Sequence, residues 1–75
     1  MSSQAFRLMY PRHLVNEPII NNLLREYSFT LNILYANISP DSGWIDVQLT
    51  GKTAEIENAI AWLQEIGVEV LLLSQ

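Results

Sequence analysis

The sequence contains no cysteine among its 75 residues. Disulfide bonds, thiolate metal sites, iron–sulfur clusters and cysteine nucleophiles are therefore excluded. Basic residues are scarce as well, because four Lys and Arg stand against eight Asp and Glu. Binding to a phosphate backbone needs clustered cations, and these four are scattered along the chain. We therefore expect no interaction with DNA or RNA.

Long apolar runs are also missing, although hydrophobic residues make up 49% of the chain. The longest runs are far shorter than the ~20 residues that a membrane helix needs. Residues 1–4 do not begin a secretory signal. We expect a cytoplasmic protein without membrane insertion, folded as a single domain over residues 1–75 with residues 1–4 disordered. Small domains without disulfides often gain stability by association, so a homodimer is expected.

The sequence offers few groups for catalysis. His13 is the single histidine, and no spacing places a nucleophile or a second metal ligand beside it. The three glycines are isolated, so no phosphate-binding loop is present. We expect a protein that is not an enzyme and that has no cofactor and no metal site.

The most apolar stretch, residues 30–39, predicts a strand that is closed by the turn residues 40–43. Strict alternation would place Leu31, Ile33 and Tyr35 on one face. Leu34, Ala36 and Ile38 would then lie on the other face, together with the single amide Asn32. Both faces are apolar, so the strand needs cover on two sides.

The remaining chain predicts three strands and two helices. Strands are expected at residues 5–10, 44–50 and 68–73, and amphipathic helices at residues 18–27 and 53–66. The order is that of an α+β, ferredoxin-like βαββαβ fold with a four-stranded antiparallel sheet in the order 4-1-3-2. Both helices would cover one face of the sheet. The opposite face would expose the side chains of Met9, Trp44, Asp46 and Gln48.

Two residues have both a structural and a functional interpretation. Asn32 is either a solvated amide on an edge strand or the orienting polar group of an apolar small-molecule site. Trp44 is either an anchor for the turn or the wall of a pocket. An exposed apolar edge strand favours association, which makes Leu34, Ala36, Ile38 and Trp44 the candidate interface.

The chain resembles the NIL domain family, which is named for its Asn-Ile-Leu tripeptide. The resemblance rests on the following residues: Asn32, Ile33, Leu34, Ala36, Ile38, Gly43, residues 45–49, Gly51, residues 59–65 and residues 67–70. It also takes in the first strand and residues 18–20, so it spans nearly the whole chain. The ATPase domain and the cluster cysteines that accompany this domain elsewhere are missing from the 75 residues.

The resemblance implies a ferredoxin-like, ACT-like regulatory module. Such modules lie at the C-terminus of the ATPase subunit of methionine ABC importers, where paired domains bind methionine and inhibit transport. They also precede ferredoxin domains in some bacteria. By position, Asn32 would contact the amino acid, and Ile33 and Leu34 would shape the strand around it.

The leading hypothesis is a stand-alone NIL-type regulatory domain. It would bind a small molecule such as methionine at or near a homodimer interface. The alternative hypothesis is an interaction module that docks on a separate protein, such as a transporter subunit or a ferredoxin-type protein, and has no small-molecule ligand.

Overall fold

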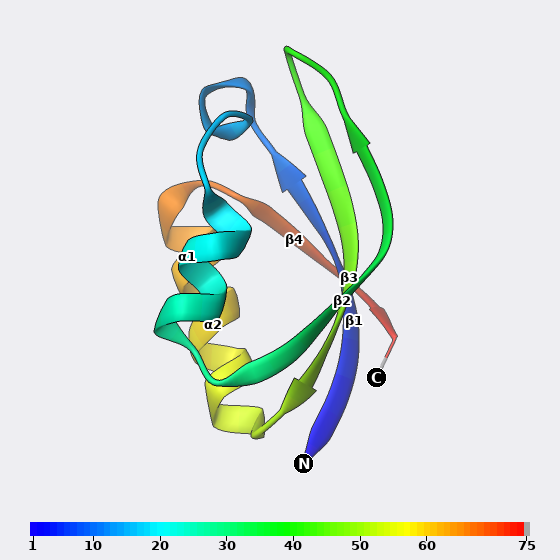
Figure 1. The fold of residues 1–75 in the computed structure, drawn as a ribbon, viewed down its shortest axis with the longest axis vertical. Helices are drawn as coiled ribbons and strands as arrows, with labels where there is room; N and C mark the ends of the chain where they lie inside the picture. The colour runs from blue at the N-terminus through cyan, green and yellow to red at the C-terminus, as the bar shows by residue number, and fades with distance from the viewer. Residues whose placement is uncertain (75) are drawn as a thin grey trace.

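The computed structural model describes residues 1–74, which form four strands and two α-helices in the order βαββαβ (Figure 1). The elements are β1 (Ser2–Tyr10), the 3-10 turn η1 (Arg12–Leu14), α1 (Ile19–Glu26), β2 (Phe29–Ile38), β3 (Gly43–Gly51), α2 (Thr53–Ile66) and β4 (Glu69–Ser74). The strands pair antiparallel in the order β2-β3-β1-β4, so β2 and β4 are the edges. The predicted ferredoxin-like arrangement is confirmed, with the predicted strand order read from the other edge.

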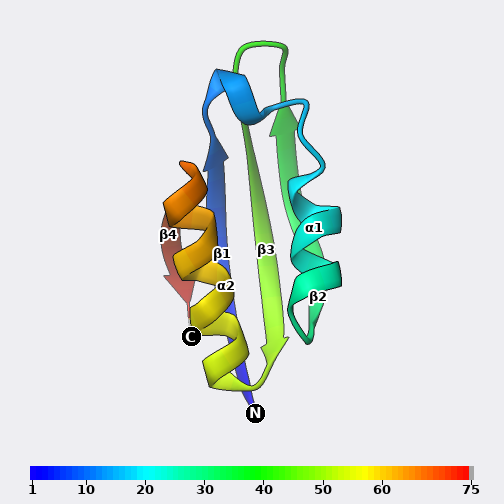
Figure 2. The ribbon, with the colours of Figure 1, turned by 90° about the vertical axis from the view of Figure 1, so that its left-hand side faces the viewer.

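Both helices pack on the same face of the sheet, where α2 lies over β1 and β4 and α1 lies over the β2 side (Figure 2). The alternation of β1 and β3 turns every second side chain toward the helices. The helices contribute residues at helical spacing, such as Ile56, Ala59 and Leu63, all fully buried. The other buried apolar residues of this core are Phe6, Leu8, Tyr10, Leu14, Ile19, Leu23, Ile45, Val47, Leu49 and Val68.

The strand β1 begins earlier than the sequence predicts. Ser2, Ser3 and Gln4 pair with the end of β3, so the expected disorder of residues 1–4 is wrong for these three residues. The Ser3 hydroxyl lies 3.2 Å from the Thr50 hydroxyl and accepts a hydrogen bond of 2.8 Å from Gln48. The strand β3 extends to Gly51, and its backbone pairs with residues 2–4. The polar side chains of residues 2–4 do not reveal this pairing.

A β-bulge interrupts β2 and changes which side chains share a face. Ile33 pairs with Val47 and Tyr35 pairs with Asp46, so Leu34 is the extra residue. Directly paired residues point to the same face of a sheet. The faces predicted by strict alternation are therefore wrong beyond Ile33.

On the helix side of β2 lie Leu31, Ile33, Ala36 and Ile38, and on the open side lie Asn32, Tyr35 and Asn37. All residues from 32 to 38 are exposed. The helices do not cover the open face, and the far end of the β2–β3 hairpin projects beyond them (Figure 1).

Truncation of a core leucine tests this packing. We expect Leu63→Ala to lower the free energy of unfolding by about 2–5 kcal/mol, since it removes fully buried methyl groups and leaves a cavity. Urea unfolding followed by circular dichroism measures the change. Leu24→Ala is the matched control, since this side chain on α1 is 46% exposed; an equal loss in both variants would contradict the described core.

Candidate functional site

The open face of the sheet carries an ion pair at its centre. The Arg7 Nε donates to the Asp46 Oδ1 at 2.7 Å and Nη2 donates to Oδ2 at 3.0 Å, a bidentate arrangement. The Arg7 guanidinium also lies 4.2 Å from the centre of the Trp44 ring, within cation–π range. Asp46 is only 5% exposed, so its expected exposure is wrong. The two charges neutralise each other on a face that no helix covers.

Hydrogen bonding governs the protonation of this pair. The hydrogen bond from Arg7 holds the pKa of Asp46 below its ordinary value, and the nearby positive charge acts in the same direction against desolvation. The hydrogen bond to Asp46 likewise raises the pKa of Arg7. Both side chains therefore stay charged at neutral pH.

The three predicted ligand residues do not point into one hollow. Asn32 lies on the open face opposite Gln48, and its side chain is exposed. Ile33 lies on the helix side and is 58% exposed, while Leu34 is the extra residue of the bulge. The strand therefore presents Asn32 with Tyr35 as its open-face neighbour, a combination that strict alternation does not predict.

The predicted interface residues are likewise divided between the faces. Trp44 pairs with Met9 and Asn37 on the open face, whereas Ala36 pairs with Ile45 on the helix side. Ile38 also lies on the helix side, where its Cδ1 approaches Gly43. The predicted interface residues therefore lie on both faces of the β2–β3 hairpin, and their contact with a partner stays a prediction.

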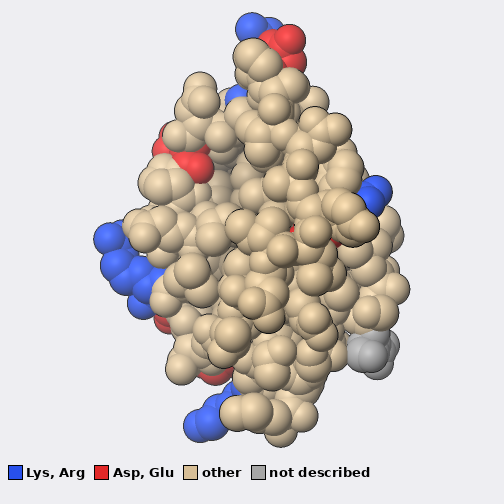
Figure 3. Space-filling view, turned by 45° about the vertical axis from the view of Figure 1, so that its right-hand side comes forward, with Lys and Arg blue, Asp and Glu red and all other residues tan. Residues whose placement is uncertain are grey.

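The surface around β2 is nearly free of charge. Figure 3 shows an expanse of uncharged atoms over β2 and the open face, with Lys, Arg, Asp and Glu mostly at its margins. Large apolar side chains of β2 are exposed within it, among them Leu34 at 45% and Tyr35 at 70%. Exposed large apolar side chains on a surface with few charges make this region a candidate interaction site.

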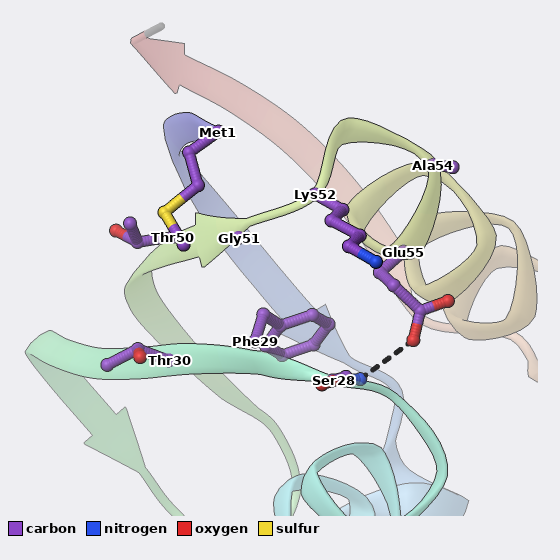
Figure 4. Close-up of a pocket in the computed structure, with 9 residues that line it drawn as sticks. All are labelled: Met1, Ser28, Phe29, Thr30, Thr50, Gly51, Lys52, Ala54 and Glu55. Atoms are coloured by element: carbon purple, nitrogen blue, oxygen red, sulfur yellow. Dashed lines mark hydrogen bonds between the residues drawn. The ribbon is translucent and has the colours of Figure 1, made fainter.

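A hollow lies at the start of β2, between the ends of the strands and the start of α2 (Figure 4). It has a volume of about 540 Å³ and is lined by Met1, Ser28, Phe29, Thr30, Thr50, Gly51, Lys52, Ala54 and Glu55. Glu55 accepts a hydrogen bond of 2.9 Å from the Ser28 backbone N–H. Phe29 approaches Gly51 so closely that a Cβ on this glycine would lie 2.8 Å from the Phe29 Cβ. Sequence patterns did not indicate this hollow, because the ends of three elements form it.

The groups that could perform acid–base or metal chemistry are dispersed. No cluster of three or more His, Cys, Asp and Glu that could hold a metal ion occurs within residues 1–74. His13 is exposed on η1. Tyr10 lies in the core, and burial raises its pKa to about 12, which keeps its hydroxyl protonated at neutral pH. No helix within residues 1–74 is long and apolar enough to cross a bilayer.

Comparison with known proteins gives a consistent family match. The NIL domain family matches residues 4–71. The methionine import ATP-binding protein MetN of Helicobacter pylori is 32% identical over 73 residues, which cover 92% of this chain and 22% of that protein. The chain therefore spans about a fifth of the length of this relative.

Two further comparisons involve shorter proteins. An uncharacterized protein of Synechococcus elongatus is 32% identical over 73 residues, which cover 93% of this chain and 90% of that protein. The crystal structure of the C-terminal domain of an ABC transporter ATP-binding protein from Enterococcus faecalis superposes with a TM-score of 0.82 at 27% identity. This match covers 93% of this chain and 82% of that one.

The Arg7–Asp46 pair predicts a pH dependence of stability. The folded-state pKa of Asp46 is lowered, so its contribution is present above the unfolded-state pKa of about 4 and is lost as pH falls through the lower folded-state value. We expect Asp46→Asn to be less stable than the wild type at pH 7, with the difference shrinking below about pH 4.

Chemical unfolding at a series of pH values between 7 and 2 measures this difference. Asp41→Asn is the control, because Asp41 pairs with Arg12 at 3.5 Å where both side chains are about four-fifths exposed. A pH-independent difference between wild type and Asp46→Asn would contradict the assignment.

Proposed function

The chain belongs to the NIL domain family, and we propose that it is a regulatory domain that binds a small apolar amino acid, methionine or a close analogue. The observation that carries this proposal is Asn32, the amide of the family's tripeptide, which the bulged strand β2 presents on the open, largely uncharged face. The relatives that import methionine support the choice of ligand. We place this activity in the cytoplasm.

The chemistry of β2 suits such a ligand. The Asn32 amide can both donate and accept hydrogen bonds, so it can bind the carboxylate or the ammonium group of an amino acid. The exposed side chains of Leu34 and Tyr35 offer apolar contact to the thioether chain. Ile33 lies on the other face, and we assign it the role of shaping the strand.

A second copy of the chain would complete this site. Small-molecule sites in proteins bury about 70–90% of the ligand surface, and a ligand beside an exposed Asn32 would remain largely in water. The open face suits a second copy of a chain with net charge −4, because its central charges, Arg7 and Asp46, are already paired. We therefore propose a homodimer with β2 and the open face at its interface.

Titration of methionine into the purified protein tests ligand binding directly. We expect measurable heat of binding for the wild type and at least about a tenfold weaker affinity for Asn32→Ala, because the ligand's charged groups would lose their amide partner. Asn58→Ala is the control, an exposed asparagine on α2 that lies outside the proposed site and interface. Absence of heat in the wild type, or equal effects of the two substitutions, would reject the site.

Sedimentation equilibrium tests the dimer. We expect a species of two 8.6 kDa chains for the wild type and a shift toward the monomer for Tyr35→Lys, since this places an unpaired charge within the interface. Asn58→Lys, at an exposed position on α2, should leave the dimer intact. Sedimentation of the wild type as a monomer would contradict the proposed interface. The methionine titration would still show whether the protein binds the amino acid.

A further inference from the structure

The strand β4 is the second edge of the sheet, and no described strand pairs with its outer side. Edge strands of natural proteins commonly carry lysine, proline or a bulge that discourages a further strand from pairing. The strand begins with the exposed Glu69, whereas residues 70–74 contain neither a charged residue nor a proline, and Leu71, Leu72 and Leu73 are between 42% and 49% exposed. Its register with β1 shifts at Leu73, because Ala5 pairs with Ser74 and Phe6 pairs with Leu72, so residues 69–72 are the regular part of this edge.

An apolar groove runs alongside β4 on the helix side of the sheet. It has a volume of about 240 Å³ and is lined by Gln4, Phe6, Ile56, Glu57, Ile60, Ala61, Gln64 and Leu72. Leu72 pairs with Phe6 and therefore faces this groove. Leu71 pairs with Arg7 and faces the open side of the sheet instead. A strand added next to β4 would place every second side chain at this groove.

The charges around the groove determine which occupant fits. Glu57 lines it, and α2 carries three glutamates and no lysine or arginine between residues 53 and 66. Because α2 lies over β1 and β4 (Figure 2), symmetric pairing of two β4 strands would bring two acidic helices side by side. Like charges disfavour that arrangement, whereas a basic partner would be attracted.

We propose that β4 accepts an extended, basic segment of another protein as a fifth strand of the sheet. The main chain of the segment pairs with the outer edge of β4. Its alternate apolar side chains enter the groove beside Leu72, and a Lys or Arg side chain lies opposite Glu57. This surface is on the edge opposite β2, so it acts independently of the proposed amino-acid site.

A synthetic seven-residue peptide provides the probe, with leucine and threonine alternating between a lysine at each end. We expect saturable binding in fluorescence anisotropy and slowed hydrogen exchange of β4 amides, with β2 amides unchanged. The same peptide with glutamate in place of each lysine should bind much more weakly.

Two matched pairs of variants locate the contact. We expect Leu72→Ser to weaken peptide binding about tenfold and Leu71→Ser to leave it nearly unchanged, because only Leu72 faces the groove. Glu57→Gln should weaken binding by up to about fivefold at low salt, and Glu65→Gln should not, because Glu65 does not line the groove. Circular dichroism confirms that each variant is folded.

Three results would overturn the proposal: no binding of the lysine peptide, protection of β2 rather than β4, or equal effects within each matched pair. None of them bears on methionine binding, which the titration of the Asn32 variant tests separately.

Discussion

A four-stranded sheet has two faces, and the two α-helices formed by residues 1–74 both pack on the same face. The core therefore forms entirely on the helix side, around fully buried residues such as Leu8, Leu49 and Leu63. The opposite face and the far end of the β2–β3 hairpin receive no cover from the chain itself. The exposure of Asn32 and Tyr35 on the open face follows from this one-sided packing.

The central charges of the open face are paired with each other. Arg7 and Asp46 lie on adjacent strands. Their bidentate hydrogen bonds let the Asp46 carboxylate remain ionised although only 5% of this residue is exposed. An unpaired charge at this position would oppose any layer that packs on the sheet. The edge strand β2 contains a bulge at Leu34, whereas β4 is six residues long, begins with Glu69 and shifts its register with β1 at Leu73.

The sequence predicts the element order well because the helical and strand periods are clear in it. The pattern at residues 53–66 and the alternation at residues 44–50 depend on local spacing alone. The bulge at Leu34 could not be predicted, because it is a mismatch between two strands and changes no local pattern. Nor could the burial of Asp46, whose partner Arg7 lies 39 positions away. The prediction that Asn32 lies on a strand is confirmed. Tyr35 lies on the same face as Asn32 only because of that bulge.

The placement of the two tryptophans has a spectroscopic consequence. The Trp44 ring lies beneath the Arg7 guanidinium on the open face, whereas Trp62 lies on α2 with its ring centre 6.3 Å from that of Tyr27. The indole emission of this protein therefore comes from two chromophores on opposite sides of the sheet. Replacement of Trp62 by phenylalanine would leave a single fluorophore that reports when a second layer covers the open face, without any added dye.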